Sequence, residues 1–287
     1  MVSKTLTSSI VKKFIPPRRL NSKKGDNGKV LVVGGSYMYH GAPILSSLAA
    51  LRMGSDLVYT AVPKNNVQST RAISPNLIVI PLADSKLTRG AVRKLLGQIP
   101  VGIDSATIGM GLVIQDVEAL KLLVKSLLDR DIRISLDASA LVKQVLQVVN
   151  GKDVILTPHT GEFKRLFGVE VPNEKRSRIS ITEEYAKKNS ITILLKGHDD
   201  IITDGKNTFI NSKNTPAMTV GGTGDVLSGI VASILSRNRN TIESAASGAF
   251  LNALAGKSVQ KQFGLHMLAT DLIEALPHVS KTFDKIK

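Results

Sequence analysis

The segment Val30-Leu31-Val32-Val33-Gly34-Gly35 is a short apolar run that ends at two glycines. A continuous run of β-branched and aliphatic residues is typical of a strand buried on both faces, as in the centre of a parallel sheet. Residues 42–53 then have the pattern of a helix, and a second apolar run at 57–62 is closed by Pro63. This order of strand, helix and strand predicts parallel pairing with a helical crossover.

The same alternation continues along most of the chain. The pattern predicts an α/β protein, a three-layer αβα sandwich whose mostly parallel central sheet is covered by helices on both faces. Asp204-Gly205 separates two short apolar runs and predicts a β-hairpin. The further strands are expected at 77–80, before Gly109, at 132–136, 154–156, 191–195, 201–202 and 208–210, and the helices at 89–96, 114–130, 174–189, after Gly224, at 241–261 and at 270–276.

The domain organisation follows from the absence of linkers and repeats. Residues 29–287 show no shift in composition, so we expect a single catalytic domain there. Residues 1–28 are basic and rich in turn-forming residues, and we interpret them as a lead-in segment. Four apolar residues between positions 10 and 15 would let a short helix of this segment dock on the domain.

Composition excludes several classes of protein. The 287 residues are 43% hydrophobic and include no cysteine, which rules out disulfides, thiolate metal sites and a cysteine nucleophile. No apolar run approaches the ~20 residues of a membrane span, and the first residues lack the apolar core of a signal peptide. We therefore expect a cytoplasmic protein with no membrane partner.

The formal net charge of +15 raises the question of a polyanionic partner. Nucleic acid attracts clustered lysine and arginine, whereas a basic surface can also favour small anionic substrates. The positive residues are scattered in short groups, aromatic residues make up 4% with no tryptophan, and no nucleic-acid motif is present. These observations predict small anionic substrates and no nucleic-acid partner.

The most informative loop is Gly221-Gly222-Thr223-Gly224-Asp225, which leads into an apolar helical stripe. Glycines let the backbone approach an oxyanion closely, and the free amides at a helix start attract phosphate. Gly222, Thr223 and Gly224 are thus a candidate anion hole, beside which Asp225 can accept a proton from a substrate hydroxyl. The alternative is an ordinary glycine-rich loop in which the aspartate caps the helix.

A second segment, Thr157-Pro158-His159-Thr160-Gly161-Glu162, follows a predicted strand and opens a helix. His159 can donate a hydrogen bond to a substrate, and Glu162 can position water or a hydrated metal ion. The alternative is that Thr160 caps the helix and Glu162 only favours its first turn.

Three further segments lie at strand ends, where open α/β sheets bind ligands. Lys196 to Asp200 follow a buried strand, and Lys196 is either a phosphate contact or a solvated strand end. Gly109-Met110-Gly111 is a tight loop between a strand and a helix. The loop from Gly34 to Ala42 is another, and each can be a simple turn.

Taken together and in this order, these segments resemble the ADP/ATP-dependent NAD(P)H-hydrate dehydratases of the ribokinase-like superfamily. The resemblance runs from about Gly28 to Pro277. The pieces are Gly-Gly-Ser with Gly-Ala-Pro, Gly-x-Gly-Leu, Asp-Ala-x-Ala-Leu, Thr-Pro-His-x-Gly-Glu, Leu-Lys-Gly and Gly-Gly-Thr-Gly-Asp.

The resemblance implies a reaction and its residues. ADP or ATP would phosphorylate the hydroxyl of hydrated NADH or NADPH, and loss of phosphate would restore the reduced cofactor, with Mg²⁺ neutralising phosphate charge. Asp225 would abstract the hydroxyl proton, and Gly222, Thr223 and Gly224 would stabilise the transferring phosphoryl group. Ala42, Gly111, His159 and Asp225 would contact the hydrated dinucleotide; Lys196, Gly197, His198, Asp199, Asp200 and Gly224 would hold the adenine nucleotide; Glu162 would act on the metal through water.

Two departures from the family pattern concern details. The family usually has Asp-Ala-Asp-Ala-Leu, whereas Ser139 replaces the second aspartate here. The loop after Gly109 has Met110 in place of a proline and Val113 in place of a glycine. The resemblance also implies a homo-oligomer such as a tetramer. An epimerase, often fused at the N-terminus in this family, would here be a separate protein because 28 residues cannot contain it.

Three alternatives remain open. A ribokinase-like kinase of a vitamin precursor or sugar would share the anion hole and the base, although such vitamin-precursor kinases commonly carry cysteine where Asp225 lies. A non-catalytic nucleotide-binding module would not need the base, and a basic nucleic-acid binder would show steep salt dependence. The sequence leaves undecided the choice of ADP or ATP, of NADH or NADPH hydrate, and any need for a monovalent cation.

Overall fold

The computed structural model describes residues 3–83 and 85–287, and it contains one ten-stranded sheet in the order β1-β10-β9-β8-β7-β6-β5-β2-β3-β4. Every strand expected from the sequence is present, with bounds within about two residues of the prediction. The strands are β1 (Lys4–Thr5), β2 (Lys29–Val33), β3 (Leu57–Pro63), β4 (Ile78–Leu82), β5 (Ser105–Ile108), β6 (Arg133–Leu136), β7 (Val154–Leu156), β8 (Thr192–Leu195), β9 (Asp200–Thr203) and β10 (Thr208–Asn211).

The sheet is mostly parallel. All pairings from β4 across to β8 are parallel, and so is the pairing of β1 with β10; among the described strands only β9, the first strand of the predicted hairpin, runs antiparallel to both of its neighbours, β8 and β10. The chain first proceeds outward from β2 to β3 and β4, and then returns to place β5 on the other side of β2. The loops after β2 and β5 therefore leave in opposite directions, which creates the topological switch point where such sheets bind ligands.

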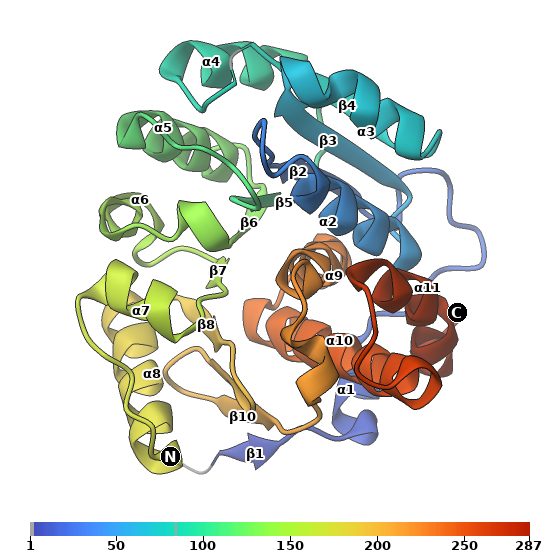
Figure 1. The fold of residues 1–287 in the computed structure, drawn as a ribbon, viewed down its shortest axis with the longest axis vertical. Coiled ribbons are helices and arrows are strands. Elements are labelled where there is room, and N and C mark those ends of the chain that lie inside the picture. Colours follow the sequence, from blue (N-terminus) through green and yellow to red (C-terminus); the bar gives the residue numbers. More distant parts are fainter. Residues whose placement is uncertain (1–2, 84) are drawn as a thin grey trace.

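Helices cover both faces of the sheet, so the predicted three-layer αβα sandwich is confirmed (Figure 1). Helices α2, α9 and α10 pack on one face with α11 outside them, and α4, α5 and α8 pack on the other. The helices are α1 (Ser8–Phe14), α2 (Gly41–Arg52), α3 (Val67–Ile73), α4 (Arg89–Gln98), α5 (Val117–Leu128), α6 (Leu146–Val149), α7 (Thr160–Phe167), α8 (Lys175–Asn189), α9 (Thr223–Arg237), α10 (Thr241–Phe263) and α11 (Ala269–Ser280).

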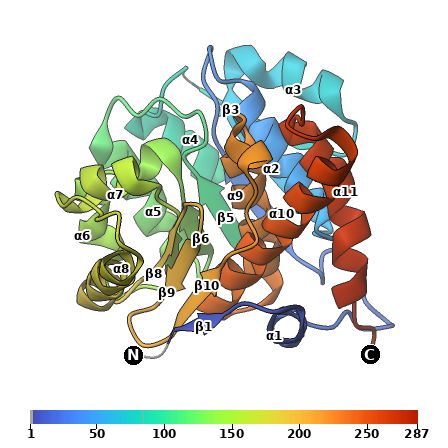
Figure 2. The ribbon, with the colours of Figure 1, turned by 60° about the horizontal axis from the view of Figure 1, so that its bottom comes forward.

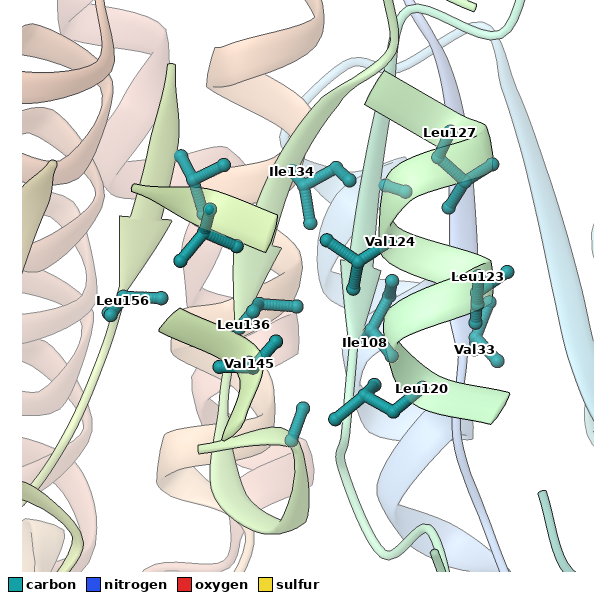
Figure 3. Close-up of a cluster of buried hydrophobic side chains, with 14 of the residues drawn as sticks. Val33, Ile108, Leu120, Leu123, Val124, Leu127, Ile134, Leu136, Val145 and Leu156 are labelled. Atoms are coloured by element: carbon teal, nitrogen blue, oxygen red, sulfur yellow. The ribbon is translucent and has the colours of Figure 1, made fainter. Parts of the chain in front are cut away.

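Successive residues of β2 are buried on opposite faces, as the period of a strand requires. Leu31 and Val33 join the core under α4 and α5, whereas Val30 and Val32 pack against α2 and α9. Figure 3 shows the first of these cores, in which aliphatic side chains of α5 interdigitate with those of β5 and β6. Burial on both faces explains why the central strands are continuous apolar runs.

Helices α2 and α9 pack unusually closely at Gly229. A Cβ atom at this position would lie 2.0 Å from the backbone oxygen of Ser46, so only glycine permits the contact. Both helices begin next to loops that the sequence marks as functional. Their close packing therefore fixes the positions of those two loops relative to each other.

The N-terminal segment packs on the sheet and on α10. Strand β1 adds to the sheet edge beside β10, and the predicted short helix forms as α1, whose Phe14 contacts Phe209 edge-on at 5.5 Å between ring centroids (Figure 2). Strand β1 was not expected, because two residues are too few to show a periodic pattern. The division of the chain at residues 28 and 29 stays a prediction. In the described part of the chain, no helix combines the length and apolarity needed to cross a membrane.

Candidate active site

The glycine-rich loop begins α9 in a conformation that its residue types require. Gly222 is the N-cap with φ of +95°, and a Cβ atom there would lie 2.7 Å from the side chain of Leu45. Asp225 is the third residue of the helix, and its carboxylate accepts no hydrogen bond from the described residues. The alternative in which Asp225 caps the helix is therefore wrong, because Gly222 occupies that position and Asp225 is free to act on a ligand.

The first turn of α9 offers unused donors. The first intrahelical bond runs from the Val226 amide to the Gly222 oxygen, and the amides of Thr223, Gly224 and Asp225 find no acceptor within the described ranges. The Thr223 hydroxyl is turned away from this space, since it donates to the backbone oxygen of Met218 at 3.0 Å. Free amides at the positive end of a helix form an anion site.

The environment of Asp225 makes it a base suited to neutral pH. Burial and then the nearby charge of Asp137 raise its pKa, the ammonium of Lys196 opposes both, and the net pKa is about 7. A carboxylate with a pKa near the working pH is an efficient proton acceptor, because it is available in the ionised form and still binds the proton well.

Asp137, Lys196 and Glu162 form a buried charge network beside this base. The Lys196 ammonium donates to Asp137 at 2.7 Å and lies 3.5 Å from Glu162. Asp137 also accepts from the Ser228 hydroxyl at 2.6 Å, one turn along α9 from Asp225. The pKa of Asp137 is lowered despite its burial, mainly through Lys196, and that of Lys196 is raised through Asp137 and Glu162. The network carries two negative charges and one positive, so it can accept a further cation.

His159 and Glu162 cap the N-terminus of α7 reciprocally, as a capping box. The Nδ1 atom of His159 accepts from the amides of Gly161 and Glu162, while a carboxylate oxygen of Glu162 accepts from the His159 amide at 2.9 Å. The cap is thus His159 rather than Thr160, one residue from the position in the capping alternative. Because Nδ1 is an acceptor, the ring proton is on Nε2, and the exposed ring can donate it to a ligand.

The segment after β8 divides into residues that support the loop and residues that face solvent. Asp200 is buried and accepts from the Gly197 amide at 3.1 Å and from Asn211 at 2.9 Å, so its side chain holds the loop; burial raises its pKa to about 6. His198 is 89% exposed. Asp199 accepts from Lys175 of α8 at 2.6 Å.

Two adjoining cavities meet at Lys196, Gly197 and His198. The α9 cavity, of about 410 Å³, extends along the start of α9 and is mainly apolar; the α7 cavity, of about 560 Å³, lies between α7 and α8 and is mainly basic. Besides the shared residues, Asp200, Asn214, Thr215, Pro216, Met218, Thr219, Thr223, Gly224, Leu227 and Asn252 line the first, and His159, Thr160, Asn173, Lys175, Arg178, Asp199 and Ile201 line the second.

The loops at the switch point lie in direct contact. The Gly35 amide donates to the Met110 oxygen at 2.8 Å. Gly111 has φ of +63°, and a Cβ atom there would lie 2.7 Å from the backbone oxygen of Tyr39 and 3.1 Å from the Cβ of Ala42. The structure thus brings Ala42 and Gly111 together, whereas His159 lies with the α7 cavity.

Ser139, which departs from the family pattern, has a role in this arrangement. Its hydroxyl donates to the Gly109 oxygen at 2.8 Å and so ties the loop after β6 to the loop after β5. Gly109 is needed at this contact, because a Cβ atom there would lie 1.9 Å from the Asp137 oxygen.

Sequence reasoning missed four residues of the site. Asp137 directly follows a predicted strand. The rule that ligands bind at the carboxyl ends of strands, which marked Lys196, could therefore have marked Asp137 as well. Lys175 and Arg178 belong to α8, a helix whose polar composition resembles any solvated helix. Asn252 lies in the interior of α10, and no local pattern separates it from the small residues around it.

Comparisons with known proteins show the family of this chain. The chain matches the family of NAD(P)H-hydrate dehydratases over residues 30–278. It is 65% identical over 286 residues to the ADP-dependent (S)-NAD(P)H-hydrate dehydratase of Nitrosopumilus maritimus, with 100% of each chain covered. It is 42% identical over 268 residues to the bifunctional NAD(P)H-hydrate repair enzyme of Pyrobaculum aerophilum, covering 93% of this chain and 53% of that one.

Among solved structures, the ADP/ATP-dependent NAD(P)H-hydrate dehydratase of Bacillus subtilis, co-crystallised with ATP and Mg²⁺, superposes with a TM-score of 0.84 at 27% identity. That match covers 99% of this chain and 100% of the other. The ribokinase-like fold and the enzyme class expected from the sequence are both confirmed. The chain belongs to the NAD(P)H-hydrate dehydratase family.

Proposed function

We propose that this protein uses ADP or ATP to dehydrate (6S)-hydrated NADH or NADPH, which repairs the damaged cofactor. The observation that supports this most strongly is the Asp225 carboxylate, which accepts no hydrogen bond from the described residues and has its pKa raised to about 7, beside three backbone amides that find no acceptor there. A base next to an anion site is what the transfer of a phosphoryl group to a hydroxyl needs. Binding alone would require the amides and not the base.

In the proposed reaction, Asp225 takes the proton of the hydrate hydroxyl as that oxygen attacks the terminal phosphoryl group of the nucleotide. The amides of Gly222, Thr223 and Gly224, of which those of Thr223 and Gly224 belong to the three free amides described above, stabilise the charge on the transferring group. The carbon–oxygen bond of the phosphate ester then breaks, a proton leaves the adjacent ring carbon, and the ring double bond is restored. The products are the reduced cofactor, phosphate and the shortened nucleotide.

The nucleotide is assigned to the two adjoining cavities. Lys175, Arg178 and Lys196 line the α7 cavity, and because Lys175 pairs with Asp199 and Lys196 with Asp137, Arg178 is the cation whose charge is most available to phosphate oxygens. The buried Oδ1 of Asn252 in the α9 cavity has no hydrogen-bond donor among the described residues. An unpaired buried acceptor costs about 1–3 kcal/mol, which a base with an amino group would recover. Gly197, His198, Asp199 and Gly224 line the path between the two, and Asp200 supports it from within.

The hydrated dinucleotide is assigned to the switch point, where Ala42 and Gly111 expose backbone at close quarters. His159 would donate its Nε2 proton to the same ligand from the other side. A Mg²⁺ ion would enter this site bound to the nucleotide phosphates, because no group of three possible protein ligands occurs in the described ranges. Glu162, whose carboxylate lies 3.5 Å from Lys196 and accepts from the His159 amide, would hold the hydrated ion through water.

We also propose an oligomeric state, a partner enzyme and a cellular location for this protein. Tyr37, Met38 and Tyr39 are 60–84% exposed, an apolar surface that supports a homo-oligomer such as a tetramer. The bifunctional relative, of which this chain covers 53%, supports a functional link to a separate epimerase. We place the enzyme in the cytoplasm, with small-molecule substrates and no nucleic-acid partner.

One experiment separates this proposal from a kinase. The protein is incubated with hydrated NADH or NADPH, Mg²⁺ and either ADP or ATP, and the return of absorbance by the reduced nicotinamide is followed. We expect nucleotide-dependent recovery with release of phosphate. Consumption of nucleotide with accumulation of a stable phosphorylated product, and no recovery of absorbance, would favour the ribokinase-like kinase instead.

A further inference from the structure

A third cavity, of about 460 Å³, lies at the end of the molecule where helices α2 and α9 finish; we call it the basal cavity. The N-terminal segment near Pro16 and the C-terminal segment near Phe283 close its sides, and Figure 2 shows α1 and the end of α11 at this same end. Asp225 and Arg237 are 12 residues apart on α9, which corresponds to about 18 Å at 1.5 Å per residue. The basal cavity is therefore separate from the catalytic loops.

The lining of the basal cavity carries a surplus of positive charge. Two of its cations have acidic neighbours outside the lining: Arg52 pairs with Glu274 at 3.0 Å, and Arg18 lies 3.7 Å from Asp56. The surplus positive charge therefore comes from Arg237, Lys281 and Lys285, and the described lining offers one acidic residue, Asp284, to balance it. The charged residues of the lining are Arg18, Arg52, Arg237, Lys281, Lys285 and Asp284.

Arg237 is the central cation of this group. Its guanidinium donates to the backbone oxygens of Met53 at 2.9 Å and Ser233 at 3.4 Å, and within the described ranges no carboxylate lies within 4.0 Å of it. Burial, and then the charge of Arg18, lowers the pKa of Arg237 to about 10. Capping of helix ends explains the two backbone bonds, and the charges of Asp284 and Asp56 oppose the lowering of the pKa, but within the described ranges neither carboxylate forms an ion pair with Arg237, which is costly in a partly buried place.

The rest of the lining is apolar. Ile15, Met53, Leu251 and Phe283 are all buried and face the same space. We propose that the basal cavity binds a small amphipathic anion, whose phosphate or carboxylate head lies at Arg237 and Lys281 and whose short apolar body packs on these side chains. Such a ligand supplies the missing counter-charge and fills the apolar part of the cavity.

The test is calorimetric titration of the full chain with octyl phosphate, octanoate and inorganic phosphate. We expect saturable binding of one octyl phosphate or octanoate per chain, at least about tenfold tighter than inorganic phosphate, and the tighter of the two identifies the head group. Arg237→Met should weaken this binding at least about tenfold. Arg239→Met, which removes an exposed arginine paired with Asp131, is the matched control and should leave it unchanged.

Several results would overturn the proposal: no saturable binding of either amphiphile, equal binding of inorganic phosphate, equal binding by Arg237→Met, or displacement of the probe by ADP. If Arg237→Met does not fold, the exposed Lys281 serves instead. Lys281→Met should then weaken binding at least about threefold, and unchanged binding would contradict the assignment.

Discussion

The Lys196 ammonium lies 2.7 Å from a carboxylate oxygen of Asp137, and both side chains are largely buried beside the catalytic loop. Removing one partner of a buried ion pair leaves the other charge uncompensated, at a cost of about 3–5 kcal/mol. We predict that Asp137→Asn lowers the free energy of unfolding by an amount at the lower end of this range, because Glu162 remains near Lys196. Denaturant unfolding measures the change.

The matched control is a double-mutant cycle. The double variant Lys196→Met with Asp137→Asn should be more stable than the sum of the two single changes predicts. Each single change leaves one buried charge without its partner, whereas the double variant removes both charges. Additive effects would show that the pair contributes no coupling to stability.

The pH dependence of activity should report the titration of Asp225. The base acts only when ionised, and burial raises its pKa to about 7, so kcat/KM should rise with pH through a midpoint near 7 and level off above it. Steady-state rates measured across this range give the midpoint. A midpoint near 3.8, the ordinary value for aspartate, would mean that the site does not perturb this group.

Two glycine substitutions, one at the contact between α2 and α9 and one at an exposed position of α4, should change stability in opposite directions. Gly229→Ala would place a Cβ atom 2.0 Å from the Ser46 oxygen, so the helices must separate, and we expect a loss of about 1–3 kcal/mol together with a higher KM. Gly97→Ala, at an exposed position of α4 with nothing within 4 Å, should gain about 0.5–1 kcal/mol. Thermal unfolding compares the two, and a neutral Gly229→Ala would contradict the close packing.

His159 has two separable roles, and two substitutions divide them. His159→Asn keeps a side chain that can cap α7, so stability should hold while KM for the hydrated dinucleotide rises. His159→Ala should lose the cap as well, at a cost of about 1 kcal/mol. If KM is unchanged in both variants, His159 has only the structural role.

The sequence predicted the fold well because its central strands and helices carry strong periodic patterns. It also marked the loop at Asp225, the Ala42 and Gly111 turns and Lys196 as candidate site residues, since each directly follows a strand or opens a helix; their roles stay predictions. It could not show that Asp200 supports the loop from inside or that Asp225 accepts no hydrogen bond from the described residues, because these depend on contacts between distant segments. The sequence did not mark Asn252 and Arg178 for the same reason, because they line cavities that only tertiary packing creates.

In the proposed mechanism, Asp225 is the base that activates the hydrate hydroxyl. The most direct measurement is the rate of absorbance recovery from hydrated NADH with ADP or ATP in Asp225→Asn, whose amide has nearly the same shape but cannot take the proton. We predict a fall in kcat of about 10²–10⁴-fold with nucleotide affinity unchanged. Turnover by Asp225→Asn at the unsubstituted rate would contradict the account.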